Sequence, residues 1–173
     1  MPILTVAEAR WSVLLDAGTA GAVPPAAAVA VLGGKGAQTA KLVASGLPVP
    51  PTGVVTVEAY RSVAADPLVA RMVARIRQGE DVAADEVDAV FQAATLPADV
   101  AAGIVRLASS VAGGGRMAIR SSATVEDLGG TSFAGQYRSF LDVAPGRAVL
   151  EAVRLVWASL WHPADGLKDG TTG

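Results

Sequence analysis

Hydrophobic and polar positions along this chain follow two different periods, and each period predicts a different kind of element. Short apolar runs bounded by glycine or proline are typical of buried strands. Four stretches have this form: residues 28–32 (AVAVL), 53–57 (GVVTV), 116–120 (RMAIR) and 137–143 (YRSFLDV). The sequence therefore predicts four strands, the first of which stops at a pair of glycines.

Apolar residues spaced three or four apart predict helices between and after these strands. Residues 35–46 place alanines on one face and stop at Gly46, and residues 57–64 predict a shorter helix. The middle of the chain has three apolar stripes: Leu68, Met72 and Ile76, beside Val69 and Val73; Val87, Val90, Phe91 and Ala94; and Val100, Ile104, Leu107 and Val111, opened by Pro97. A last helix within residues 145–161 places on one face Val149, Val153, Val156 and Leu160. Three successive helices favour an α+β fold, with a short mixed sheet and several helices, over a regular βαβ array.

Composition narrows the class of protein. The chain has 173 residues, of which 51% are hydrophobic and 17% charged, as expected for one globular domain. A net charge of -2 and a pI near 5.3 argue against a nucleic-acid partner. The absence of cysteine excludes disulfides and thiolate metal sites. No apolar run approaches membrane-spanning length and the start lacks a secretory signal, so we expect no membrane contact and a cytoplasmic location.

The first candidate site is LGGKGAQTAKL, residues 32–42. Gly34 and Gly36 flank Lys35 at the predicted start of a helix, where backbone N–H groups and the lysine charge both favour phosphate. The stretch is not a Walker A loop, because no hydroxyl follows the lysine. The alternative is a tight strand-to-helix turn with an exposed lysine.

The second candidate is the polar stretch that begins at Arg120. An arginine at the end of a buried strand can be aimed rigidly at a phosphate. Further polar groups follow it: Ser121, Ser122, Thr124, Glu126 and Asp127. Function is the favoured interpretation for Arg120, whereas the serines, threonine and acidic pair also fit a local role as turn, cap and first-turn residues.

The third candidate is GGTSFAGQYRSFL, where three glycines permit a flap with Phe133 at its tip. Such a flap can close over a triphosphate and exclude water. A hairpin with a core phenylalanine is the alternative. His162 is the only histidine and is interpreted as a helix-end residue, and the neighbouring Trp157, Leu160 and Trp161 as core.

Together, GGKGAQTAKLVASGLPVPPTGVVTVEAYRSV and MAIRSSATVEDLGGTSFAGQYRSFLDV resemble the N-terminal nucleotide-binding domain of the dikinase family. That family includes phosphoenolpyruvate synthase, pyruvate phosphate dikinase and rifampicin phosphotransferase. The resemblance covers about residues 31–161 and implies an ATP-grasp fold. It also implies that ATP phosphorylates a histidine on a separate domain, leaving AMP and phosphate, before the phosphoryl group passes to pyruvate or another acceptor.

Carried over by resemblance, Lys35 and Arg120 contact the nucleotide phosphates, with Gly34, Gly36 and Ser121 beside them. Residues 131–136 match the glycine-rich loop over the nucleotide, with four residues as candidates: Thr131, Ser132, Gly135 and Gln136. The expected cofactors are ATP and Mg²⁺, with the metal ligands outside this chain. No catalytic residue is expected within it, and His162 does not correspond to the phosphorylated histidine.

The resemblance divides the chain into residues 1–27 as an N-terminal extension, 28–162 as part of an ATP-grasp domain, and 163–173 as a disordered tail. The expected partners are ATP, the remaining half of the ATP-grasp domain, and histidine and acceptor domains. Without that half, we expect Phe133, Trp157 and Trp161 to be partly uncovered and the active site to be incomplete. The alternative function is a stand-alone, non-catalytic module that binds a nucleotide or a partner.

Overall fold

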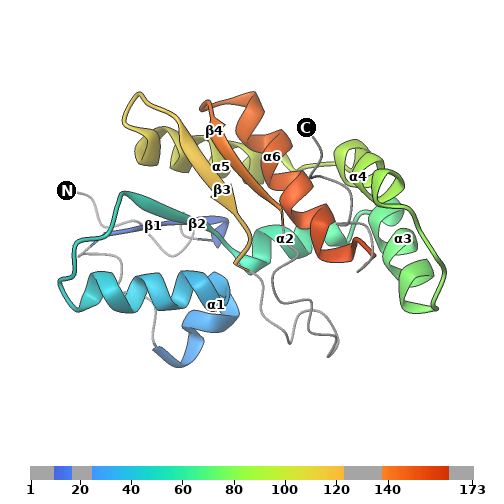
Figure 1. Ribbon diagram of the computed structural model, residues 1–173, viewed down its shortest axis with the longest axis horizontal. Coiled ribbons are helices and arrows are strands. Elements are labelled where there is room, and N and C mark those ends of the chain that lie inside the picture. Colours follow the sequence, from blue (N-terminus) through green and yellow to red (C-terminus); the bar gives the residue numbers. More distant parts are fainter. Residues whose placement is uncertain (1–9, 17–24, 123–137, 164–173) are drawn as a thin grey trace, which may run out of the picture.

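The computed structural model describes residues 10–16, 25–122 and 138–163. Within these ranges the chain forms an α+β fold with six α-helices and two antiparallel sheets of two strands each. The elements, in chain order (Figure 1), are β1 (Ser12–Leu15), α1 (Pro25–Ala44), β2 (Thr52–Val55), α2 (Val57–Ala64), α3 (Pro67–Arg77), α4 (Ala84–Ala93), α5 (Ala98–Ala112), β3 (Met117–Arg120), β4 (Ser139–Val143), α6 (Arg147–Ala158) and the 3₁₀ turn η3 (Ser159–Trp161).

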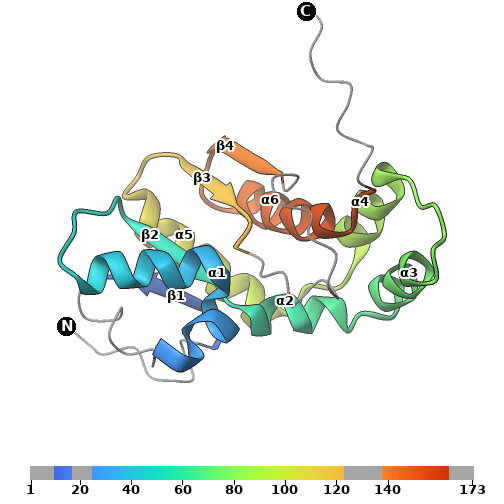
Figure 2. The ribbon, with the colours of Figure 1, turned by 60° about the horizontal axis from the view of Figure 1, so that its bottom comes forward.

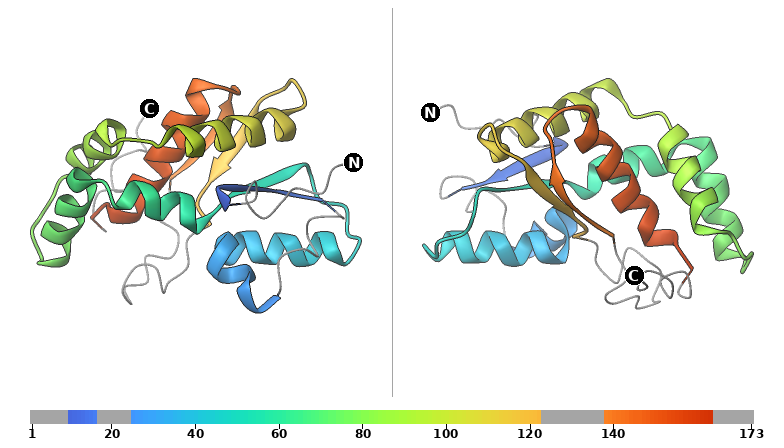
Figure 3. Two further views of the ribbon diagram at one scale, coloured as in Figure 1. Left: turned by 180° about the vertical axis from the view of Figure 1, so that it is seen from behind. Right: turned by 45° about the horizontal axis from the view of Figure 1, so that its top comes forward.

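The β1–β2 sheet separates two apolar clusters. Helix α1 lies on one face of this sheet and α5 on the other (Figures 1 and 3). Val13 and Leu15 alternate toward α1 and join a cluster with Leu32 and Val54. On the opposite face the Ser12 hydroxyl donates to the Gly103 carbonyl of α5 at 3.2 Å. Because successive side chains of β1 point to opposite faces of the sheet, this strand contacts α1 on one face and α5 on the other.

The larger cluster fills the space between α2, α3, α4, α5 and α6. It is centred on residues with no exposed surface: Ala59, Val63, Val69, Val87, Phe91, Val100 and Ala158. At the edge of this cluster, the β3–β4 sheet lies against α6 (Figure 2). Tyr60 and Trp157 meet edge to face with ring centroids 6.0 Å apart, and Trp161 Nε1 donates to the Tyr60 hydroxyl at 3.0 Å. These aromatic contacts fix α2 against the end of α6.

Helical periodicity predicted α2, α4, α5 and α6 correctly, and the strands β2, β3 and β4 lie within or close to their predicted ranges. On α3 the buried side chains are Val69 and Met72, while Leu68 is 50% exposed, so the predicted stripe is wrong at Leu68. Pro97 precedes the first turn of α5, and Gly113 ends it with a left-handed φ of 54°.

Two predictions about the sheets are wrong. Residues 28–32 are helical and belong to the first part of α1, because small apolar residues flanked by glycine fit a buried helix as well as a strand. The strand that pairs with β2 is β1, which lies within the predicted N-terminal extension, and Ser12 pairs with Val55. In place of one mixed sheet there are two separate antiparallel pairs within the described residues.

No single helix in the described ranges is long and apolar enough to cross a membrane. Among the described helices, the pair α4 and α5, bent by 103°, is the one that reaches that length and composition together.

Thr56 ties β1 to α2, and its replacement tests that link. Its buried hydroxyl donates to the Arg10 carbonyl at 2.6 Å and accepts from the Ala59 N–H at 3.3 Å, which caps α2. We expect Thr56→Val to lower the free energy of unfolding by about 1–3 kcal/mol at constant side-chain volume, since the Ala59 N–H loses a buried hydrogen bond and the Arg10 carbonyl a part-buried one. Urea denaturation measures the change.

The matched control is Thr39→Val, because the Thr39 hydroxyl donates only within α1, to the Lys35 carbonyl. We expect this control to stay within about 0.5 kcal/mol of the parent. Equal effects of the two substitutions would contradict the role given to Thr56.

Candidate functional site

Helix α1 is broken at Gly33. This residue has φ 70° and ψ 174°, a conformation outside the helical region that is essentially restricted to glycine. The break divides α1 into a segment that ends near Leu32 and a longer segment that begins beside Lys35. The prediction that a helix begins at the glycine-rich stretch is therefore confirmed, although a helix and not a strand precedes it.

Ser122, which is distant from α1 in the sequence, bridges this break. Its hydroxyl donates to the Leu32 carbonyl at 2.8 Å and accepts from the Gly36 N–H at 2.8 Å. The first of these groups ends one helical segment, and the second lies in the first turn of the next, so neither has a partner within its own helix. One side chain therefore satisfies both helix ends.

The glycines of α1 allow this close approach. A Cβ atom at Gly33 would lie 1.9 Å from the Ser122 carbonyl oxygen, and one at Gly36 would lie 3.0 Å from Leu32 Cβ and 3.4 Å from Ser122 Oγ. No side chain fits at Gly33. The glycine-rich stretch is thus a packing surface for the segment that follows β3, in addition to any contact with a ligand.

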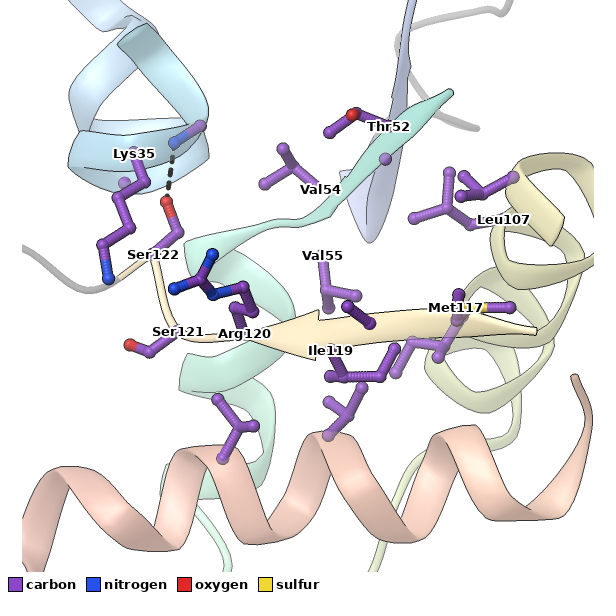
Figure 4. A pocket seen from close by; sticks show the side chains of 18 of the residues that line it. Lys35, Thr52, Val54, Val55, Leu107, Met117, Ile119, Arg120, Ser121 and Ser122 are labelled. Atoms are coloured by element: carbon purple, nitrogen blue, oxygen red, sulfur yellow. Dashed lines mark hydrogen bonds between the residues drawn. The ribbon is translucent and has the colours of Figure 1, made fainter. Parts of the chain in front are cut away.

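A pocket of about 810 Å³ runs from this junction along β3. Its long interior is apolar and is formed by side chains of β2, α5, β3 and α6, including Val55, Leu107 and Ile119. Lys35, Arg120, Ser121 and Ser122 gather at one end, and Met117 and Leu107 at the other (Figure 4). The volume lies in the range of small-molecule sites, which are mostly apolar with a few convergent polar groups.

The two cations at this end come from different parts of the fold. Lys35 follows the break in α1, and Arg120 is the last residue of β3. Both are exposed, and within the part of the chain that the structure describes neither forms an ion pair. Two unpaired cations beside one pocket are an arrangement suited to an anionic ligand.

Arg75 shows how a cation is held by carboxylates of the protein itself. Arg75 on α3 forms ion pairs with Glu80 and Glu86, each at 2.6 Å. The two carboxylates raise the pKa of the Arg75 guanidinium above its usual value, and the hydrogen bonds from Arg75 hold the pKa of Glu80 below its usual range. This surface network joins α3 to the start of α4 and lies outside the pocket.

The structure brings together only part of the predicted site. Lys35, Gly36, Arg120 and Ser121 line the pocket with Gly33, and Gly34 lies beside them in the chain. The Gly36 N–H is already donated to Ser122, so a phosphate contact at that amide would have to replace this bond. The remaining candidates lie outside the described residues: Thr124, Glu126, Asp127, Thr131, Ser132, Phe133, Gly135 and Gln136.

His162 is a helix-end residue, as predicted. It follows η3, and its Nε2 atom lies 2.8 Å from Asp88 Oδ1 on α4. Asp88 also pairs with Arg138, the first described residue before β4. Trp157 and Leu160 are core residues, as predicted, which makes the expectation of a partly uncovered Trp157 wrong, while Trp161 is half-buried.

No group of three or more His, Asp or Glu side chains in the described ranges is arranged to hold a metal ion. The placement of Mg²⁺ ligands outside this chain stays a prediction.

The family model for the pyruvate phosphate dikinase AMP/ATP-binding domain matches residues 29–164. The chain therefore belongs to this family of nucleotide-binding domains, in agreement with the resemblance drawn from its motifs.

Three curated relatives illustrate the range of the family. The chain is 36% identical over 145 residues to a phosphoenolpyruvate synthase of Aeropyrum pernix. It is 35% identical over 144 residues to a rifampicin phosphotransferase of Streptomyces sviceus, and 34% identical over 130 residues to a prodigiosin-synthesizing transferase of Serratia marcescens. These matches cover 76%, 77% and 75% of the chain but only 18%, 16% and 14% of the relatives.

Gly33→Ala tests whether the junction requires glycine. We expect it to lower the free energy of unfolding by more than the roughly 1–3 kcal/mol that its backbone conformation costs a residue with a side chain, because the new Cβ also collides with the Ser122 carbonyl. Chemical denaturation of the parent and the variant gives the difference.

Gly146→Ala is the control, since Gly146 also has a positive φ, of 101°, but open space around the Cβ position. It isolates backbone strain from collision. If Gly33→Ala has the same free energy of unfolding as Gly146→Ala, the collision with Ser122 adds no cost and the junction does not require glycine.

Proposed function

We propose that the chain is the ATP-binding part of a dikinase-type phosphotransferase and that it holds the nucleotide phosphates between Lys35 and Arg120. The observation that carries this proposal is the meeting of these two unpaired cations at one end of the pocket. Membership in a family of AMP/ATP-binding domains supports the choice of nucleotide.

The two side chains suit different parts of a polyphosphate. A guanidinium donates two parallel hydrogen bonds to one phosphate, and its position at the end of β3 limits where it can point. The lysine supplies a mobile point charge, and the helical segment after Gly33 adds the positive end of its dipole. When a ligand fills the pocket, the apolar walls beyond these cations lower the local dielectric constant, which strengthens the electrostatic contacts.

These residues fit the phosphates of ATP, and we infer an ATP-grasp architecture for the complete nucleotide site. Mg²⁺, when bound, neutralises phosphate charge and polarises the transferred phosphoryl group. The Thr131–Gln136 segment is proposed as the loop over the nucleotide. Within this chain, Lys35 and Arg120 bind and orient the phosphates.

The names of the relatives differ in the acceptor. One set is named for phosphoenolpyruvate synthesis and another for rifampicin phosphorylation, yet the chain matches both at similar identity. This favours a shared first step, in which ATP phosphorylates a histidine on another domain and leaves AMP and phosphate. Different acceptors, pyruvate among them, would then receive the phosphoryl group from that histidine.

Charge removal tests the phosphate site. We expect Lys35→Ala and Arg120→Ala each to weaken MgATP binding by about 1.5–3 kcal/mol, the scale of a charge-assisted hydrogen bond. Isothermal titration calorimetry of the purified chain measures the loss. Both side chains are exposed, so the thermal unfolding midpoint should stay close to that of the parent.

Lys41→Ala and Arg106→Ala are matched controls. Both residues are exposed cations, on α1 and α5, that lie outside the pocket lining, and each removes one positive charge. If the site variants bind no more weakly than these controls, the phosphates bind elsewhere. Absence of MgATP binding by the parent would instead favour a module that binds a different partner.

A further inference from the structure

Ser122 has a place in the site that its sequence position did not reveal. The hydroxyl of a serine carries one proton and two acceptor positions. In this structure the proton is donated to the Leu32 carbonyl, and the Gly36 N–H occupies one acceptor position. The Ser122 hydroxyl therefore has no hydrogen left to donate to a phosphate, although it lies at the same end of the pocket as Arg120.

We propose that Ser122 is a positioning residue that acts through Lys35, by holding the break of α1 at a fixed distance from the end of β3. This proposal rests on the function proposed above, since it concerns the affinity of the same site for nucleotide phosphates. It assigns Ser122 no contact with the ligand.

The geometry explains how one hydroxyl can set the lysine. Leu32 and Gly36 bracket Lys35, and both are tied to the Ser122 side chain. Gly33 adds a second constraint, because its Cα lies so close that a Cβ would reach within 1.9 Å of the Ser122 carbonyl oxygen. Ser122 is two residues after Arg120, so the same short segment that carries the arginine also holds the turn that carries the lysine.

A double-mutant cycle tests whether Ser122 acts through Lys35. We expect Ser122→Ala to raise the Kd for MgATP about tenfold in the parent, which corresponds to about 1.4 kcal/mol. In the Lys35→Ala background the same substitution should raise Kd by less than about threefold, since residues that act through one another are not additive. Equal fold-changes in the two backgrounds would overturn the proposal.

Ser122→Thr is the conservative variant, because it keeps the hydroxyl, and we expect it to restore most of the affinity lost in Ser122→Ala. Ser110→Ala is the matched control. The Ser110 hydroxyl donates to the Arg106 carbonyl on the exposed side of α5, so its loss removes a similar hydrogen bond away from the pocket. This control should bind MgATP as the parent does.

Hydrogen exchange provides a readout that needs no ligand. In Ser122→Ala we expect the Gly36 amide to exchange at least about tenfold faster than in the parent, because it loses its acceptor. Ser110→Ala should leave that rate unchanged. Unchanged Gly36 exchange in Ser122→Ala overturns the proposal whether or not the chain binds ATP.

The two proposals fail in different ways. If the parent does not bind MgATP, the proposed function is contradicted. The positioning role is then contradicted as well, even if the Gly36 amide exchanges faster in Ser122→Ala. If the parent binds MgATP and the Ser122→Ala variant binds it equally well, only the positioning role is contradicted. Global unfolding of Ser122→Ala, seen as lost helical circular dichroism, also contradicts it, because the role assigned to this hydroxyl is local.

Discussion

The Ser122 carbonyl and the α-carbon of Gly33 lie so close together that no side chain fits at Gly33. This close approach is one of the contacts that join two parts of the molecule with separate apolar clusters, beside the Ser12–Gly103 hydrogen bond between β1 and α5. One cluster holds α1 against the β1–β2 sheet, and the other holds the remaining helices around Phe91. The pocket opens where these parts meet, so its shape depends on how closely Ser122 packs against the break in α1.

The glycines beside Lys35 thus meet more than one demand. In a phosphate-binding stretch, glycine is usually explained by the room it leaves for the ligand. Here Gly33 leaves room for Ser122 and Gly36 leaves room for Leu32 and Val54, and Gly33 also adopts a backbone conformation that other residues rarely reach. The same sequence feature therefore builds the junction and exposes the lysine, and substitutions at these glycines will alter both.

The sequence carried clear information where a pattern had only one physical meaning. The stripe Val149, Val153 and Val156 could only be the buried face of a helix, and α6 buries all three. Residues 28–32 had two meanings, since a short apolar run fits a strand or a buried helix, and tertiary packing against the β1–β2 sheet selected the helix. The pairing of β1 with β2 depends on a contact between distant residues that no local pattern encodes.

The same distinction applies to the site. Lys35 and Arg120 stood out as charges in unusual local settings, and both line the pocket. The role of Ser122 was hidden, because one serine of a pair looks like the other until the chain is folded. Its partners, Leu32 and Gly36, lie 90 and 86 positions away.

These separations have a consequence for how the molecule is made. Closing a long loop costs entropy before any contact rewards it, so contacts between distant residues tend to form late. The hydrogen bonds of α3, α4 and α5 join only neighbouring residues, so these helical turns can begin to form transiently once their own residues leave the ribosome. At that stage Lys35 has been synthesised, but Arg120 and Ser122 have not emerged. The charged end of the pocket is therefore completed late, after every residue of α3, α4 and α5 has been synthesised.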